Sequence, residues 1–510
     1  MAEATSPMTR SFTFPQPSAG DVIAGVSVAL VAIPQSLAYA ELAGLPAQYG
    51  LYASALPSVF AAAFVSSRQL QTGPVALTAL LTFGALSATT EPFSDDYIAR
   101  AALLALMVGA IRVLLGVLRM GRVAYLLSEP VLLGFTTAAA VLITASQLPK
   151  VFDVAGDDRG VLGEAAHALT HPDEWRWGAI AFAALVAVLM LGGRKVHRLF
   201  PGVLVAVLLA LVISRTTDYS GTKVGQLDGG FVSLQLSFPW SSLGSLIFPA
   251  IAIALVGFAE PASIARTFAA EDRERWSANR EFISQGVANL VAGLSGAFPV
   301  GGSFSRSALN RVAGATSPWA GAITGLIVLA ALPVTTALAD LPSAVLGAIV
   351  IVAVAKLIRL HSIVALIRTN AVQGLVAAGT FIATLAASPG VQWGVVIGVG
   401  LSIAAHLYRE LSVSTSTHIE GDDLIISPKG VVWFATVPTL DERLRANLVA
   451  HPEVDSVIID LGAVGRLDFS GAASLARLVA ETAASGIPVS VTNVPPGCER
   501  AARTHLSDVM

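Results

Sequence analysis

The chain has 510 residues, of which 54% are apolar and only 13% are charged. Soluble domains carry about 25% charged residues, so a water-soluble fold could not cover this much apolar surface, whereas a lipid bilayer can. The net charge of −3 provides no basic surface for nucleic acid, and a single cysteine, Cys498, excludes a disulfide framework or a cysteine-rich metal site. We therefore expect a polytopic membrane protein that needs no metal and no cofactor.

The chain begins with a polar, proline-containing segment, residues 1–20, which we expect to lie in the cytoplasm. Apolar stretches then follow one another up to about residue 410, and the rest is more charged, with short apolar runs typical of strands. Residues 21–410 are thus predicted to form a membrane transport domain, and residues 411–510 a cytoplasmic α/β domain. The apolar stretches predict about fourteen membrane spans, near 21–40, 50–66, 74–88, 99–118, 124–148, 177–192, 202–214, 244–264, 281–297, 303–316, 318–338, 343–358, 369–387 and 389–407.

Lysine and arginine are distributed unevenly over the loops between these stretches. If the N-terminus is cytoplasmic, the inner loops contain most of the cations, for example Arg194, Lys195 and Arg198, whereas the outer loops contain few. Because positively charged loops stay on the cytoplasmic side, we expect both termini to lie inside an inner cell membrane.

Two segments of the chain resemble each other at a distance of 225 residues (260 − 35 = 225). Residues 28–40, with Gln35 and Tyr39, align with residues 253–265, in which Glu260 takes the position of Gln35. Seven spans separate the two segments, and an odd number of spans places the halves in opposite orientation. We therefore expect a seven-plus-seven inverted repeat, an architecture found in many transporters.

The same shift brings the third span onto the tenth, and both are short. The third begins at 71–76 with a Gly-Pro pair, and the tenth at 298–307 with a Gly-Gly pair. About fifteen helical residues cover roughly 22 Å of a hydrocarbon core near 30 Å, so extended backbone must complete each crossing. Two helix N-termini meeting near mid-membrane form an anion site, to which Arg306 adds a positive charge. Such motifs can also be packing contacts or kinks, but their matched positions favour two half-helices.

Polar residues within the spans need an explanation because their burial in a membrane is costly. A carboxyl at Glu260 is desolvated, which favours its protonated form, so we interpret it as a proton-coupling residue; the alternative is a fixed partner of Arg306 or a helix cap. Gln35 can donate to an anion, with Tyr39 one turn further along the same face, although Gln35 could also bridge two helices. The transported ligands are therefore expected to be a small anion and a proton.

These residues lie in motifs of a known family. Residues 34–52, PQSLAYAELAGLPAQYGLY, resemble the signature of the SulP sulfate permeases, also called solute carrier family twenty-six, and the resemblance extends to the regions around Glu260 and Arg306. It implies an anion exchanger, symporter or channel, formed as a homodimer, in which a core and a gate subdomain move relative to each other. Carried over by motif, the substrate would be bound by Gln35, Tyr39, Val75, Ala76, Ser303, Ser305 and Arg306.

The C-terminal residues resemble a STAS domain, the type found in anti-sigma-factor antagonists. The expected strands and helices lie at 424–427, 430–436, 456–461 and 487–492 and at 441–450 and 470–485. Relatives carry a phosphorylated serine at the start of the second helix, where this chain has Asp468 and Ser470; either residue could instead only cap the helix. The resemblance also implies a cytoplasmic regulator that acts on this domain.

The sequence thus predicts a secondary anion transporter, and not an enzyme, that carries a small dianion by proton symport and elevator-like alternating access. The dianion would be a dicarboxylate such as fumarate, or sulfate. Sodium-coupled bicarbonate symport or anion exchange is the alternative, because Glu260 and nearby hydroxyls could also bind Na⁺. Nucleobase–proton symport would leave Arg306 without an anionic partner, and a non-transporting sensor would place the function in residues 411–510.

Overall fold

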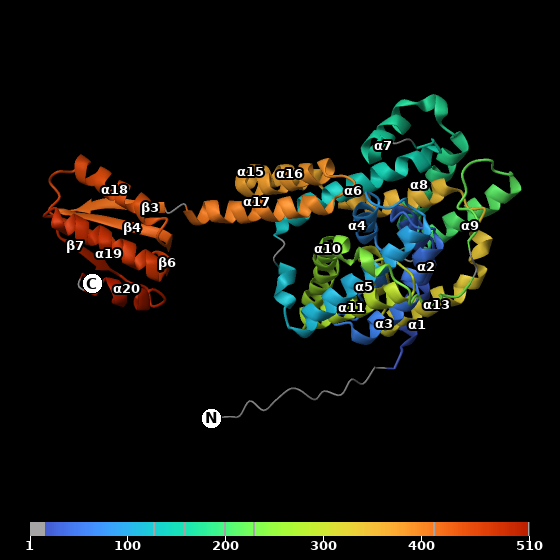
Figure 1. Ribbon diagram of the computed structural model, residues 1–510, viewed down its shortest axis with the longest axis horizontal. Coiled ribbons are helices and arrows are strands. Elements are labelled where there is room, and N and C mark those ends of the chain that lie inside the picture. The colour runs from blue at the N-terminus through green and yellow to red at the C-terminus, as the bar shows by residue number, and fades with distance from the viewer. Residues whose placement is uncertain are drawn as a thin grey trace. The chain divides into compact units, whose positions relative to one another are not determined.

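The chain divides into two compact units, residues 1–401 and residues 402–510 (Figure 1). In the first unit the described residues form helices and one two-stranded sheet, and in the second they form an α/β unit with a five-stranded sheet. The boundary between the units falls inside one helix, α17 (Gln392–Leu411). This computed structural model describes residues 16–125, 128–156, 159–197, 200–227, 230–411, 414–507 and 509–510.

The helices of the first unit follow the apolar stretches of the sequence, and each of the predicted stretches overlaps at least one helix. Before α17 they are α1 (Ala19–Leu42), α2 (Gln48–Ser54), α3 (Leu56–Phe64), α4 (Ala76–Leu86), α5 (Asp95–Val117), α6 (Glu129–Phe152), α7 (Gly160–Thr170), α8 (Trp177–Val196), α9 (Gly202–Thr216), α10 (Leu243–Asp272), α11 (Ala278–Leu294), α12 (Phe304–Val312), α13 (Trp319–Ala331), α14 (Ser343–Val354), α15 (Leu360–Thr369) and α16 (Ala371–Ala386). Short 3-10 helices lie at Gly121–Tyr125, Pro172–Glu174, Trp240–Ser242, Leu332–Leu338 and Ala355–Leu357. The helices α7 and α15 lie between predicted stretches.

Length separates the helices that can cross a bilayer alone from those that cannot. The helices α4 and α12 have only 11 and 9 residues, and α2 and α3 are separated by a bend at Ala55. The protein is thus a polytopic helical membrane protein, whereas the number of fourteen crossings stays a prediction. Among the described residues, six segments are long and apolar enough to span a membrane: Ala19–Leu42, Asp95–Val117, Glu129–Phe152, Trp240–Asp272, Trp319–Leu338 and Ser343–Thr369.

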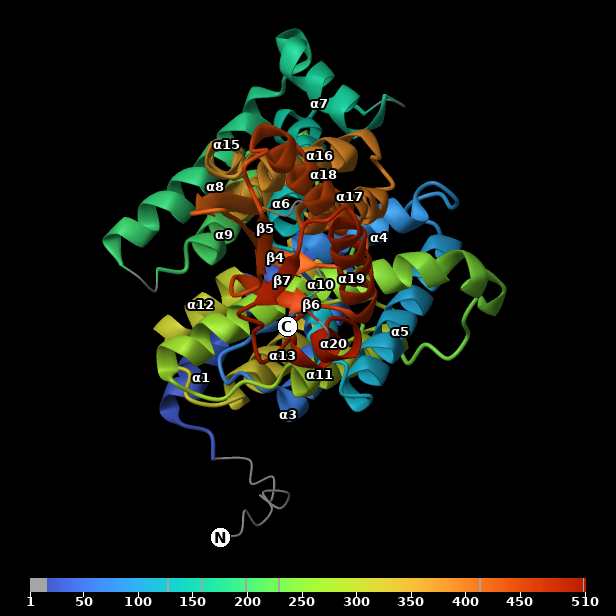
Figure 2. The ribbon, with the colours of Figure 1, turned by 90° about the vertical axis from the view of Figure 1, so that its left-hand side faces the viewer.

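The helices of the first unit pack in two groups, and each group combines segments from both halves of the chain. In the first group α5 packs against α10 and α11, α3 packs against α11 and α13, and α1 packs against α13. In the second group α6 packs against α8, α14 and α16. In Figures 1 and 2 the first group lies in the lower part of the first unit, and α6, α8 and α16 lie above it. An inverted repeat predicts this interleaving, because equivalent segments of its halves lie around one pseudo-twofold axis.

The second unit is built on a sheet with strand order β3-β4-β5-β7, in which β6 pairs with β4. Strands β3 and β4 are antiparallel, and the other pairs are parallel. Alternate residues of β4 and β5, such as Leu424, Ile426, Val457 and Ile459, are buried in the core of this unit, together with Cys498. The elements are β3 (Ser414–Glu420), β4 (Asp423–Val432), α18 (Val437–Ala450), β5 (Ser456–Asp460), β6 (Val464–Leu467), α19 (Phe469–Ala484), β7 (Val489–Thr492) and α20 (Glu499–His505).

Three details of the predicted strands are wrong, and one of them is that β6 (Val464–Leu467) was not predicted. The strands expected at 424–427 and 430–436 form the single strand β4, whose register shifts between Gly430 and Val431. The first part of β4 pairs with β5 and the part after the shift pairs with β6. Strand β3 was not predicted, because its polar residues are exposed or half-buried and give no apolar alternation.

Asp468 caps the N-terminus of α19, where its Oδ1 accepts a hydrogen bond from the Gly471 N–H at 2.6 Å and one from the Ser470 hydroxyl at 3.0 Å. Substitution Asp468→Ala removes an N-cap worth about 1 kcal/mol, so the Gly471 amide should exchange its hydrogen about five times faster in the full-length protein. The matched substitution Ser470→Ala keeps the capping bond and should change this rate far less. Equal effects of the two substitutions would contradict this assignment of the cap.

Candidate functional site

The centre of the first unit contains two short extended segments that pair with each other. Strand β1 (Thr72–Gly73) and strand β2 (Gly301–Gly302) are antiparallel, with Thr72 opposite Gly302 and Gly73 opposite Gly301. The Ser303 N–H donates to the Gln71 carbonyl at 2.9 Å, which extends the pairing beyond the strands. Each strand is followed closely by a short helix, β1 by α4 and β2 by α12.

Both helices are even shorter than the sequence suggested. With 11 and 9 residues, α4 and α12 are about 16 Å and 14 Å long, roughly half of a hydrocarbon core. Val75 is the N-cap of α4 in extended conformation, and Ser303 is the N-cap of α12, where its Oγ accepts from the Arg306 N–H. Two helix N-termini therefore begin directly behind the paired strands, which is the arrangement expected for an anion site.

One face of α11 carries the polar groups that hold these extended segments. Glu281, Gln285 and Asn289 follow at intervals of four residues, and all three are fully buried. The Glu281 carboxylate accepts hydrogen bonds from the N–H groups of Ser66 and Ser67, both at 3.2 Å, at the end of α3. This fixes the segment that leads from α3 into β1.

The other two residues of this face hold β1 and the segment before β2. The Gln285 side-chain amide donates to the Thr72 hydroxyl at 2.8 Å. The Asn289 side chain binds both backbone groups of Val300: its Oδ1 accepts from the N–H at 2.9 Å, and its Nδ2 donates to the carbonyl at 3.0 Å. We call Glu281, Gln285 and Asn289 the α11 ladder.

A buried arginine completes the support of this region. The Arg112 guanidinium is fully buried and donates to three backbone carbonyls, those of Val300 at 3.0 Å, Ile253 at 3.0 Å and Ala254 at 3.1 Å. Gly257 makes room for it, since a Cβ at that position would lie 2.7 Å from Arg112 Nη2. Arg112 thus joins α5, α10 and the segment before β2, which is a structural role.

A second buried arginine, Arg306 on α12, reaches across to the opposite half-helix. Its Nη2 donates to the Pro74 carbonyl at 2.6 Å, and its Nη1 lies so close to β1 that a Cβ at Gly73 would be 3.0 Å away. Among the described residues Arg306 Nε has no hydrogen-bond partner, although the side chain is only 1% exposed. The positive charge therefore lies between the two helix N-termini and retains a free donor.

Glu260 and Tyr39 lie beside this arginine. Glu260 on α10 accepts a hydrogen bond through Oε1 from the Phe304 N–H at 3.2 Å, at the first residue of α12. Tyr39 on α1 is buried and interacts electrostatically with both Glu260 and Arg306. Two of the three groups carry opposite formal charges, so a proton or an anion that arrives here changes the balance of charge directly.

The other predicted site residues lie on the same elements, at different distances from this centre. The Ser303 and Ser305 hydroxyls are 3.3 Å apart at the start of α12. Val75 faces β2, since its Cγ2 would be 3.2 Å from a Cβ at Gly301, and Ala76 opens α4. Gln35 is buried one turn before Tyr39, and its Oε1 lacks a hydrogen-bond partner within the described part of the chain.

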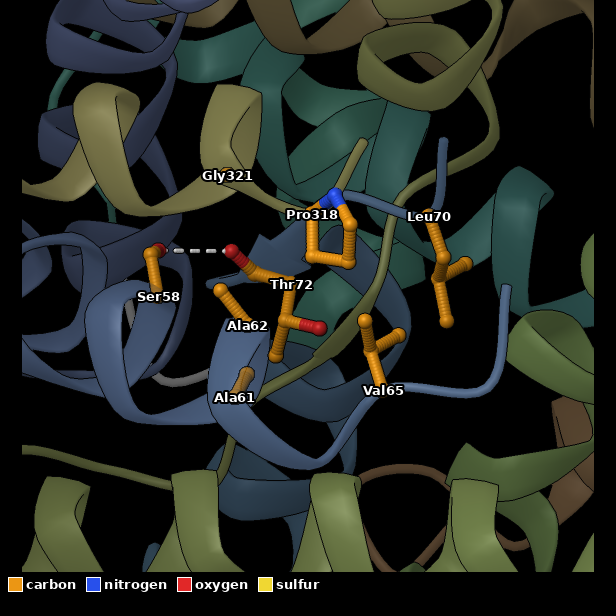
Figure 3. Close-up of a pocket in the computed structure, with 8 residues that line it drawn as sticks. All are labelled: Ser58, Ala61, Ala62, Val65, Leu70, Thr72, Pro318 and Gly321. Atoms are coloured by element: carbon orange, nitrogen blue, oxygen red, sulfur yellow. Dashed lines mark hydrogen bonds between the residues drawn. The ribbon is translucent and has the colours of Figure 1, made fainter. Parts of the chain in front are cut away.

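A small cavity lies between α3, β1 and the start of α13. Figure 3 shows its lining, with Ser58 and Thr72 facing each other and the Ser58 hydroxyl donating to the Thr72 carbonyl at 2.7 Å. The remaining lining residues are mostly apolar: Ala61, Ala62, Val65, Leu70, Pro318 and Gly321. The predicted anion-binding residues do not line this cavity, so we regard it as a packing feature next to β1.

Comparison with known proteins identifies the family. The profile of the sulfate permease family matches residues 19–380, and that of the STAS domain matches residues 414–510. The chain is 31% identical over 516 residues to the probable sulfate transporter 4.2 of Arabidopsis thaliana, an alignment that covers 93% of this chain and 76% of that protein. The chain belongs to the sulfate permease family.

Further comparisons agree in sequence and in fold. A probable sulfate transporter of Mycobacterium tuberculosis (strain CDC 1551) is 36% identical over 396 residues, which cover 76% of this chain and 70% of that protein. The structure of murine Slc26a9, an anion transporter, superimposes with a TM-score of 0.85 at 22% identity and covers 98% of this chain and 88% of that one. The protein is thus an anion transporter with a C-terminal STAS domain, and not an enzyme.

Sequence reasoning found the half-helices of this chain but missed the residues that support them. The α11 ladder could have been detected, because three polar side chains at intervals of four in a membrane helix must share one buried face. Arg112 is the second supporting residue, and it has three carbonyl partners. The partners of Arg112 lie far away in the sequence, so no local sequence pattern predicts them.

Asn289 provides a direct test of the support for β2. Substitution Asn289→Leu leaves the Val300 N–H without its acceptor in a buried site, and each unpaired group costs about 1–3 kcal/mol. The free energy of unfolding of the purified protein in detergent should fall by at least this amount. In the control Asn447→Leu, on α18, the side chain makes one hydrogen bond to the Arg443 carbonyl near the surface, so the expected loss is at most about 0.5 kcal/mol. Equal losses would contradict the role assigned to the α11 ladder.

Proposed function

We propose that this anion transporter is a symporter that carries a small dianion together with a proton. The observation that carries the proposal is the hydrogen bond from the Phe304 N–H to the Glu260 carboxylate, next to Arg306. The helix N-terminus that would hold an anion is thus occupied by an acid of the protein itself. Sulfate is the dianion proposed first, because the relatives are named sulfate transporters, and a dicarboxylate such as fumarate is the second.

The anion would bind between the N-termini of α4 and α12. Arg306 would supply the full positive charge through its free Nε, and the backbone N–H groups of the two helix starts would supply further donors. Gln35, Tyr39, Ser303 and Ser305 would orient the anion, and the small side chains Val75 and Ala76 would set the size of the site.

Competition between Glu260 and the anion would couple the two ligands. The ionised carboxylate repels an anion and occupies the Phe304 N–H. Protonation removes the negative charge and weakens that hydrogen bond, so the proton and the anion would favour each other's binding. Carrying one proton with a dianion reduces the charge moved against an inside-negative potential, worth about 2.3 kcal/mol per charge per 100 mV.

Alternating access would arise from motion between the two helix groups, as core and gate, in the elevator manner. The site residues lie on α1, α4, α10 and α12, which belong to the first group or pack against it. The ion pair between Glu41 on α1 and Lys150 on α6, at 2.6 Å, joins the two groups and would have to change when they move. The paired strands and the α11 ladder lie within the first group, so the site would travel as one body.

The cellular setting is part of this proposal. The protein would lie in the inner cell membrane as a homodimer, with both termini and residues 411–510 in the cytoplasm, as the distribution of loop cations predicts. A cytoplasmic regulator would act on the STAS domain, and phosphorylation of Ser470, an exposed residue at the start of α19, would be one route.

Transport assays in proteoliposomes test the coupling. Labelled sulfate and fumarate are offered with and without an inward proton gradient, to the wild type and to Glu260→Gln. The wild type should accumulate one of these anions only with the gradient, and Glu260→Gln should retain gradient-independent exchange because it cannot release a proton. Glu271→Gln, which changes an exposed glutamate on the same helix α10, is the matched control and should keep its response to the gradient.

The same assay separates the alternatives. Uptake that ignores the proton gradient but requires sodium or a counter-anion would replace proton symport by sodium-coupled bicarbonate transport or exchange. Uptake of a nucleobase would contradict the proposed class of substrate, a small dianion. Net flux that persists when residues 411–510 are deleted would exclude a sensor whose function resides in the STAS domain.

Gly73 tests the position of Arg306. Its φ of +155° is strained for a residue with a side chain, and a Cβ would lie 3.0 Å from Arg306 Nη1, so Gly73→Ala should displace the guanidinium and raise the KM for the transported anion about ten-fold, or about 1.4 kcal/mol. The control Gly192→Ala lies on α8, where a Cβ meets nothing within 4 Å, and should leave KM unchanged. An unchanged KM in Gly73→Ala would remove Arg306 from the anion site.

A further inference from the structure

The helix α15 stands apart from the spans on either side of it. It follows the 3-10 helix Ala355–Leu357 after a break at Arg359, where φ is −116° and ψ is 49°. At its other end Asn370 caps α16 by accepting from the Gln373 N–H at 3.1 Å. The chain thus turns sharply on both sides of this ten-residue helix.

α15 is held firmly against its neighbours. It packs on α16 and α6, and Figure 1 shows it beside α16. The contact with α16 is very close, since a Cβ at Gly374 would lie 2.4 Å from the Ile367 Cα. Ile363 is 5% exposed and is turned into this packing. The outer face of α15 is therefore a fixed surface.

That outer face is apolar. Leu360 is 47% exposed, Val364 47% and Ile367 39%. Their spacing of four and three residues places them on one side of the helix. Apolar side chains in such a stripe avoid water, and a short helix between two spans can turn them toward the acyl chains of the bilayer.

Cations flank the apolar stripe, and no acid balances them. Lys356, Arg359 and Arg368 are exposed, and within the described residues none of the three forms an ion pair. The sequence contains no Asp or Glu between Asp340 and Glu410. This segment thus has a purely positive surface around an apolar stripe, which is the composition of a helix that binds anionic lipid.

We propose that α15 lies in the headgroup region of the inner leaflet and that Lys356, Arg359 and Arg368 bind the phosphate groups of anionic phospholipids. The three cations are distributed over thirteen positions of the chain, roughly 15–20 Å if helical, so they do not converge on one free phosphate ion. A lipid surface presents many phosphates side by side and matches this spacing. The helix would anchor the second helix group to the membrane plane at α16 and α6.

The first experiment measures lipid binding to the full-length protein. Native mass spectrometry of the protein in detergent with phosphatidylglycerol or phosphatidylcholine compares the wild type with the triple variant Lys356→Gln, Arg359→Gln, Arg368→Gln. Phosphatidylglycerol affinity should fall about five-fold for each cation removed, and phosphatidylcholine binding should not change. The charge-matched control Lys429→Gln, Arg466→Gln, Arg477→Gln changes exposed cations of the second unit and should bind as the wild type does.

Two results of this experiment would overturn the proposal. One is unchanged phosphatidylglycerol binding in the triple variant. The other is full displacement of the lipid by inorganic phosphate or by glycerol phosphate at equal concentration, which would show a site for free phosphate instead of a lipid surface.

The second experiment needs no charge removal and reports the depth of α15. A nitroxide is attached to Val364→Cys in proteoliposomes; the native Cys498 is fully buried and does not compete. The spin label should collide more with oxygen than with a water-soluble nickel chelate. The control Val449→Cys, at a valine that is 84% exposed on α18, should show the reverse. Equal access of the chelate to both positions would place α15 in water or against a soluble partner and would overturn the proposal.

Discussion

Backbone that leaves helical conformation inside a membrane must find all its hydrogen-bond partners within the protein, because the hydrocarbon offers none. Within the described part of the first unit, two such segments lie around β1 and β2, and they are where we propose the anion site. The two segments satisfy some of each other's backbone hydrogen-bonding groups, because Thr72 and Gly73 pair antiparallel with Gly301 and Gly302. Side chains of α11 and Arg112 provide further hydrogen-bond partners for Thr72 and for the backbone of Val300.

The two buried arginines, Arg112 and Arg306, differ in how many hydrogen bonds they make to the backbone. Arg112 uses its guanidinium on three carbonyls of α10 and of the segment before β2, so its charge is committed to the backbone. Arg306 makes one such bond, to Pro74, and its Nε stays unbound within the described structure. A buried cation with an unsatisfied donor is costly, and an anionic ligand would repay that cost. In the proposed site Arg306 would bind the anion, whereas Arg112 holds the backbone of α10 and of the segment before β2.

Much of this arrangement could be read from the sequence, because membrane spans are specified by composition and length. The repeat of Gln35 and Glu260, the short third and tenth spans and the arginine between them depend on local patterns, and the structure has short helices there. The partners of Arg112 and Arg306 could not be foreseen, since they lie about 140 to 230 residues away and only tertiary packing brings them together. In the STAS domain, β3 escaped notice because both of its faces are polar, and pairing with β4 decides its conformation.

The spacing of the α11 ladder has a consequence for how such a transporter can acquire a new substrate. One rigid helix fixes segments from both halves of the chain at four-residue intervals, so a shift of either strand would break bonds to the other through α11. A change in the backbone around the proposed anion site would therefore disturb both strands at once. A substitution would disturb it least where the side chain points away from β1, β2 and the α11 ladder. Ser305, whose hydroxyl lies 3.3 Å from that of Ser303, is of that kind. Diversity of cargo would then accumulate at a few lining positions, on a scaffold that hardly varies.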